Sequence, residues 1–131
     1  MSTSPERRRA LSRAPLEARY GYSRAVRIGE RVIVSGTAPI RADGSCDPDP
    51  GLQARRCCEI IVAALAELGA EPGDVVRTRM FVTNAEHADA VGLAHAQFFA
   101  DAAPAATMVV VSGLLDERWL VEIEAEALIS A

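Results

Sequence analysis

The stretch Val-Glu-Ile-Glu-Ala-Glu-Ala, residues 121–127, constrains the fold of this chain more than any other segment. In an extended backbone successive side chains point to opposite faces, so its apolar residues line one side and Glu122, Glu124 and Glu126 the other. Such a strand belongs to a sheet with one buried face and one face that carries carboxylates. Two interpretations remain open: three solvated glutamates, or a carboxylate removed from water whose pKa is raised by burial and repulsion.

Helical periodicity interrupts a series of strand patterns. From residue 52 to residue 68 apolar side chains recur at helical spacing, and Gly69 followed by Pro72 supplies a stop signal. Asn84 can cap a second one-sided helix, whose apolar stripe reaches Phe98. Strands are expected over residues 24–28, 31–35, 74–83, 107–111 and 119–129. In the third of them, the core face is expected to hold Val76, Thr78, Met80 and Val82.

The expected order is strand, strand, helix, strand, helix, strand, strand, which predicts an α+β sandwich with two helices over one sheet face. With 131 residues, half of them apolar, the chain fits one compact domain. We expect this domain over residues 20–131 and a flexible N-terminal segment over residues 1–19. Arginines at positions 7–9 and 13 fit a solvated tail better than a binding element.

The charge balance excludes one class of function. The net charge is −4 and the pI is about 5.2, whereas nucleic-acid binding through a broad surface needs clustered cations. The sequence contains no apolar run long enough to span a membrane and no secretory h-region, so a cytoplasmic protein is expected.

Cysteine and histidine positions give no support for a metal centre. Cys46, Cys57 and Cys58 are odd in number and lack metal-ligand spacing, and we expect at least one of the adjacent pair to be a buried helix residue. His87 and His95 lie eight residues apart without a cysteine cluster. Neither a metal nor another cofactor is expected.

Six short motifs, in order along the chain, are similar to those of one known family. They are Tyr22–Val26 (Y-S-Q-A-V in the family), Val34–Gly36 (V-S-G), Asp74–Thr78 with Phe81–Thr83 (D-V-V-K-T and Y-V-T), Phe98–Phe99 (F-F), Pro104–Ala105 (P-A-R) and Val121–Ala125 (V-E-I-E-A). The chain therefore resembles the RidA family, also called YjgF/YER057c/UK114, over residues 20–128. Typical members are trimeric enamine and imine deaminases.

The resemblance implies one mixed sheet covered by two helices, assembled into a trimeric barrel with small-molecule clefts between subunits. Carried over by position, Glu122 would orient or activate water, and the substrate-binding positions would be Tyr22, Ser35, Gly36 and Ala106. Each also has a structural interpretation: Tyr22 as a hydrophobic anchor, and Ser35-Gly36 as a turn or bulge. The partners implied are further copies of this chain and a small metabolite.

The departures from the family concern the substrate clamp. The third residue of P-A-R, an arginine that holds the substrate carboxylate, is Ala106 here. A family asparagine on the second helix corresponds to Gly92, and a nearby tyrosine is replaced by His95. Arg24 and Arg79 are the candidate cations to replace the lost clamp, although each also fits a surface or ion-pair role. Arg77 and Arg79 are expected to pair with the glutamates across the sheet.

Three functions remain open from the sequence. The first is a small-molecule-binding protein that hydrolyses an imine, an enamine or a related C–N compound other than the usual 2-imino acids. The second is a metabolite-binding or regulatory trimer without turnover. The third is a protein interaction scaffold that uses the arginine-containing N-terminus.

Overall fold

Six strands and two long helices make up most of the chain in the structure, a computed structural model that describes residues 6–12 and 14–130. The strands are β1 (Arg7–Ala10), β2 (Ala25–Ile28), β3 (Arg31–Thr37), β4 (Val75–Val82), β5 (Ala105–Val110) and β6 (Val121–Leu128). The helices are α1 (Pro15–Tyr20), α2 (Pro50–Glu67) and α3 (Ala88–Phe99), with 3-10 turns η1 (Pro72–Asp74) and η2 (Ala85–His87).

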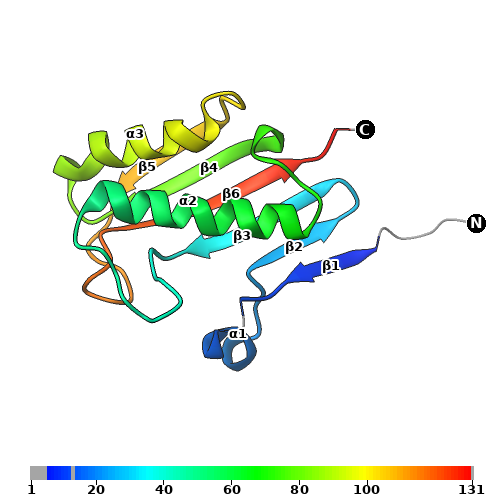
Figure 1. Ribbon diagram of the computed structural model, residues 1–131, viewed down its shortest axis with the longest axis horizontal. Helices are drawn as coiled ribbons and strands as arrows, with labels where there is room; N and C mark the ends of the chain where they lie inside the picture. Colours follow the sequence, from blue (N-terminus) through cyan, green and yellow to red (C-terminus); the bar gives the residue numbers. More distant parts are fainter. Residues whose placement is uncertain (1–5, 13, 131) are drawn as a thin grey trace, which may run out of the picture.

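The strands form a single sheet in the order β1-β2-β3-β6-β4-β5, and α2 and α3 lie side by side across one face (Figure 1). Strand β5 runs parallel to β4, whereas every other neighbouring pair is antiparallel. The expected α+β architecture, with one mixed sheet covered by two helices, is confirmed.

Helix α2 starts two residues before the expected position because of its cap. The Asp49 carboxylate accepts a hydrogen bond from the Leu52 amide at 2.9 Å, and Pro50 occupies the first turn, where its missing N–H costs nothing. The helix stops before Gly69, whose φ of +84° few other residues adopt readily. Among the described residues, no helix combines the length and apolar character needed to cross a membrane.

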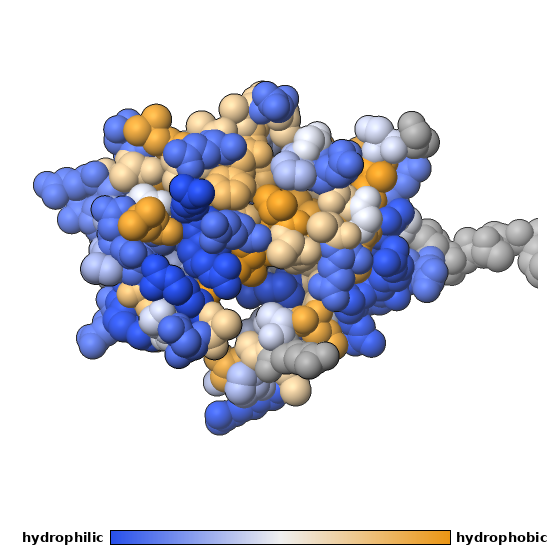
Figure 2. Space-filling view, viewed as in Figure 1, coloured by the Kyte–Doolittle hydropathy of each residue, from blue (hydrophilic) through white to orange (hydrophobic). Residues whose placement is uncertain are grey.

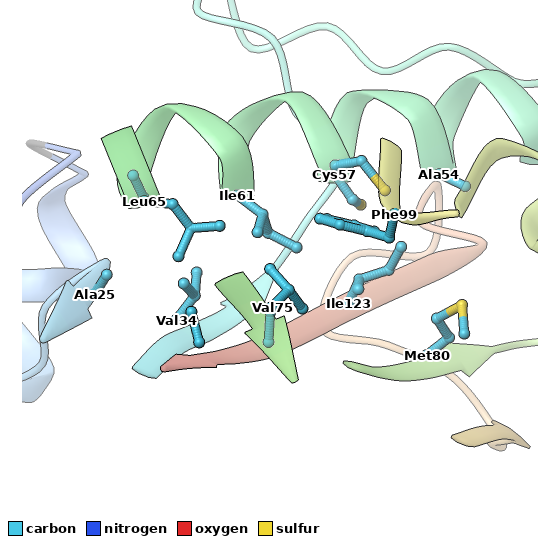
Figure 3. Close-up of a cluster of buried hydrophobic side chains, with 14 of the residues drawn as sticks. Ala25, Val34, Ala54, Cys57, Ile61, Leu65, Val75, Met80, Phe99 and Ile123 are labelled. Atoms are coloured by element: carbon cyan, nitrogen blue, oxygen red, sulfur yellow. The ribbon is translucent and has the colours of Figure 1, made fainter. Parts of the chain in front are cut away.

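The core lies between α2, α3 and the sheet (Figure 3). Cys57, Ile61 and Leu65 point from α2 toward the sheet, where Val34 and Ile123 meet them, and all five side chains are fully buried. Phe99 enters the same cluster from α3. Cys58 is also buried, so both of the adjacent cysteines serve as small core residues.

Strand β4 departs from the expected alternation at its start. The register with β6 shifts between Val75 and Arg77, so Val75 is buried and Val76 is 48% exposed. The expected core face is correct for Thr78, Met80 and Val82 but wrong for Val76. A bulge adds one residue to a strand and reverses the faces that precede it, which simple alternation does not indicate.

Residues 7–10, which lie within the segment expected to be flexible, form strand β1 in the structure. Strand β1 pairs antiparallel with β2, with Arg7 opposite Ile28 and Ala10 opposite Ala25. Ala10 is buried, whereas the three arginines of β1 are exposed. An edge strand can therefore carry solvated arginines while its backbone extends the sheet. The fourth arginine of this region, at position 13, lies outside the described residues.

Truncating a core residue tests this packing. We expect Ile61→Ala to lower the free energy of unfolding by about 2–5 kcal/mol, because it leaves a cavity where α2 meets the sheet. Leu115→Ala is the matched control, since Leu115 is 90% exposed and its truncation should change stability by about 0.5 kcal/mol or less. Urea unfolding followed by circular dichroism measures both, and equal losses would contradict the packing described above.

Candidate functional site

The sheet face away from α2 and α3, termed here the open face, carries the three glutamates of β6. Glu124 lies opposite Arg79 of β4 and Glu126 opposite Arg77, but Glu122 lies opposite Phe81. Residues directly opposite each other in a sheet share a face, so two of the glutamates have cations as neighbours across the ladder and the third does not.

Ion pairs follow this register. Arg79 Nη1 lies 3.9 Å from both Glu124 Oε2 and Glu126 Oε1, and Arg31 Nη2 lies 3.1 Å from Glu126 Oε2. Arg79 is thus engaged with the structural carboxylates. The expected pairing with the glutamates is confirmed for Arg79, whereas Arg77 forms no ion pair with them among the described residues, and Glu122 is left outside this network.

Glu122 lies against the backbone of Gly36. A Cβ atom at position 36 would come within 2.7 Å of Glu122 Oε2, so the carboxylate occupies space that only glycine leaves free. The register of β3 with β6 shifts between Val34 and Thr37, which makes Ser35-Gly36 a bulge beside this carboxylate. The glycine therefore serves a close approach between backbone and carboxylate, and the bulge is the structural interpretation that the sequence allowed for this position.

Hydrogen bonds hold the bulge in place. Ser35 Oγ donates to the Ser23 carbonyl at 2.7 Å, and Thr37 Oγ1 donates to the Ser35 carbonyl at 2.8 Å. The hydroxyl proton of Ser35 is therefore used in a hydrogen bond to the backbone of Ser23. Ser35 contributes to the neighbourhood of Glu122 chiefly by fixing the loop before β2 to the end of β3.

Arg24 is the cation that acts on Glu122. Its Nη2 donates to the Gly36 carbonyl, and its positive charge lowers the pKa of Glu122. Its Nε is buried and has no hydrogen-bond partner among the described residues. Arg24, Gly36 and Glu122 thus form a compact group, termed here the Glu122 cluster.

The net effect on Glu122 is a raised pKa. Burial contributes most, because it disfavours the charged form, and the nearby negative charge of Glu124 adds to the increase. The opposing effect of Arg24 is smaller than that of burial. A half-buried carboxylate with a raised pKa is a typical proton acceptor and donor in enzyme sites.

Tyr22 lines a separate hollow next to α1. This pocket of about 460 Å³ is formed mainly by α1 and the residues before and after it. The molecule is visibly hollowed between the α1 region and the rest of the chain (Figure 2). Glu17 is buried at this pocket and accepts hydrogen bonds from the Ser12 amide and hydroxyl. Among the described residues, no side-chain hydrogen bond joins Tyr22 to the Glu122 cluster.

Ala106 lies on the other side of the sheet from Glu122. It pairs in register with Thr78, which is fully buried under the helices, so both share the helix-covered face. Thr78 Oγ1 lies 2.8 Å from His95 Nε2 of α3. Sequence reasoning overlooked this pair, although a threonine on the core face of a strand is a recognisable signal because its hydroxyl needs a partner.

No cluster of three or more histidine, cysteine or acidic residues with metal-binding geometry occurs in residues 6–12 and 14–130. Burial raises the pKa of the Cys58 thiol to about 12 and that of Cys57 well above its usual value, so neither is a thiolate.

Comparisons with known proteins support the fold and identify the family. The family model described as endoribonuclease L-PSP matches residues 12–129. A crystal structure of Rv2704 from Mycobacterium tuberculosis, a YjgF/YER057c/UK114 family member, superposes with a TM-score of 0.87 at 40% identity over 95% of this chain and 100% of that one.

Two curated relatives extend the comparison. An uncharacterized protein of Streptomyces coelicolor is 40% identical over 95% of this chain and 94% of its own length. A 2-iminobutanoate/2-iminopropanoate deaminase of Salmonella typhimurium is 32% identical over 82% of this chain and 84% of its own length. With the family model covering nearly the whole chain, the protein belongs to the RidA (YjgF/YER057c/UK114) family.

Proposed function

We propose that this protein is a homotrimer that binds a small metabolite between subunits and hydrolyses an imine, enamine or related C–N bond. The observation that carries the proposal is the Glu122 cluster: a half-buried carboxylate of raised pKa, held over Gly36 with Arg24 beside it. The deaminase activity named for the Salmonella relative makes this reaction class the natural one to test.

The chemistry requires one group that both accepts and returns a proton. Water adds to the carbon of the protonated C=N group while Glu122 accepts one proton from this water, which gives a neutral carbinolamine. Protonated Glu122 then donates that proton to the amine nitrogen. The C–N bond breaks as the hydroxyl oxygen forms the C=O bond, and the hydroxyl proton leaves with ammonia as ammonium. A carboxylate with a raised pKa suits this exchange better than an ordinary one, because its protonated form is less costly near neutral pH.

An intersubunit site accounts for the separation of Ala106 from Glu122. These residues lie on opposite sides of the sheet in one protomer, so a ligand that contacts both positions needs two copies of the chain. The open face also exposes Ile33 (45%) and Val109 (43%), apolar surface that a second copy would cover. A cyclic trimer would repeat the same combination three times.

The position of Ala106 favours a substrate other than a 2-imino acid. An arginine fork holds a carboxylate by two charge-assisted hydrogen bonds, and a methyl group holds none. The alternative function is a trimer that binds its metabolite without turnover, which the same substitution would permit.

Replacing Glu122 tests the catalytic role. Imines are generated in situ by an amino acid oxidase and an amine oxidase, and ammonia release is followed with and without the protein. For the substrate that the wild type accepts, Glu122→Gln should slow release by about a hundredfold or more. Glu124→Gln is the matched control, because it lies on the same strand and face but pairs with Arg79, and it should retain activity.

Light scattering on both variants separates lost catalysis from lost assembly. An active Glu122→Gln variant would contradict the role of Glu122. Absence of hydrolysis by the wild type across uncharged and charged imines, with a metabolite still bound and recovered unchanged, would support the non-catalytic alternative.

The raised pKa also makes stability depend on pH. The folded protein binds the Glu122 proton more tightly than the unfolded chain, so ionising this group costs folding free energy as pH rises above 4.5 and through the folded pKa. Glu122→Gln should therefore unfold at higher urea concentration than the wild type near about pH 7, with the difference shrinking near about pH 4. A difference that does not vary with pH would contradict the shift.

A further inference from the structure

Thr78 and His95 form a polar pair inside the helix-covered layer. Their Oγ1 and Nε2 atoms lie 2.8 Å apart, Thr78 is fully buried, and His95 is partly exposed. The His95 ring also packs against Phe99, with ring centroids 5.1 Å apart. The imidazole is thus fixed from two sides.

The hydrogen bond determines which ring nitrogen carries the proton. The hydroxyl of Thr78 has His95 as its only hydrogen-bond partner among the described residues. If Nε2 donated to the hydroxyl oxygen, the buried hydroxyl proton would have no acceptor, which is costly. The arrangement that satisfies both groups has Thr78 donating to Nε2, so that Nδ1 of the neutral ring carries the hydrogen.

The Nδ1–H group is available for a ligand. Nδ1 has no hydrogen-bond partner among the described residues and is not among the buried unpartnered atoms, so it is accessible. Exposed Ala106 lies beside Thr78 on the neighbouring edge strand β5. Gly92, one helical turn before His95, faces open space, since a Cβ there would have no atom within 4 Å.

Helix α3 and strand β5, which carry His95 and Ala106, contain no permanently charged cation. The chain contains no lysine, and no arginine occurs between Arg79 and Arg118, so neither α3 nor β5 carries one. Arg77 and Arg79 share the open face with the glutamates, and Arg24 is engaged with the Gly36 carbonyl in the Glu122 cluster. Burial lowers the pKa of His95, which keeps its ring neutral at physiological pH.

We propose that His95, oriented by Thr78, donates a hydrogen bond from Nδ1 to an uncharged carbonyl-type oxygen of a ligand beside Ala106. This inference rests on the proposed small-molecule site and specifies its substrate class: an amide, ketone or similar neutral group in place of a carboxylate. His95 is a positioning and specificity residue, and Thr78 sets its tautomer.

Pyruvamide and pyruvate form a matched pair of probes, because they have nearly the same shape and differ in charge. Calorimetry on the wild-type protein should detect pyruvamide and give at least about tenfold weaker binding of pyruvate. Ala106→Arg should reverse this preference by adding the missing cation. Equal binding of both probes, or preference of the wild type for pyruvate, would overturn the inference.

Two substitutions at position 95 distinguish the ring nitrogens. The amide of His95→Asn lies where Nδ1 was and should retain most pyruvamide affinity, whereas the amide of His95→Gln lies near the Nε2 position and should lose about tenfold. The reverse order, or no loss in either variant, would contradict the assignment. Thermal unfolding of both variants checks that they are folded.

Nitrogen-15 NMR of the histidine rings tests the tautomer without any ligand. The wild type should show His95 protonated at Nδ1, Thr78→Val should lose this preference, and Thr78→Ser should keep it. Protonation at Nε2 in the wild type would overturn the inference.

Because binding is measured on stable carbonyl compounds, absence of imine hydrolysis would defeat the proposed function alone. Failure of the pyruvamide preference would defeat only this inference.

Discussion

Strand β6 lies between β3 and β4, and its antiparallel pairing with both fixes the two faces of the sheet. A one-residue change of register would exchange its buried apolar residues with its glutamates, so the pairing is strongly specified. The buried set packs under α2 and α3, and the carboxylates are left on the open face. The register of β6 therefore determines both the core and the position of the candidate site.

Three chemically identical side chains acquire different environments along β6. Glu124 and Glu126 lie within reach of Arg79, and Glu126 also pairs with Arg31, so both of these carboxylates have arginines as direct partners. Glu122, opposite Phe81, instead lies over Gly36 with Arg24 nearby. Burial raises the pKa of Glu122 more than the charge of Arg24 lowers it. The same alternation thus yields two structural ion-pairing residues and one group suited to proton transfer.

Much of the fold could be predicted from the sequence because helical spacing and alternation are local signals. The helix after Asp49, the hairpin at Gly29 and the faces of β6 all follow from such patterns. The bulge at Val76 and the pairing of β1 with β2 could not be predicted, since both depend on contacts with distant strands.

The candidate site could be predicted only in part from the sequence, because its geometry also depends on contacts between distant elements. Family resemblance identified Glu122 and Gly36, Arg24 was a candidate to replace the missing arginine, and the structure brings these three together. It also separates Ala106 from them by the thickness of the sheet, which no motif indicates. The Thr78–His95 pair joins residues 17 positions apart on different elements, so only the packing of α3 on β4 reveals it.

The proposed proton-transfer role of Glu122 requires that the environment of this carboxylate favour the protonated form. Carbon-13 NMR titration of selectively labelled glutamate side chains, assigned with Glu122→Gln, measures this directly. This role predicts that Glu122 titrates above 4.5 and that Arg24→Gln raises its pKa further, because the substitution removes the cation that opposes the effect of burial. A Glu122 pKa at or below 4.5, or one that does not respond to Arg24→Gln, would contradict it.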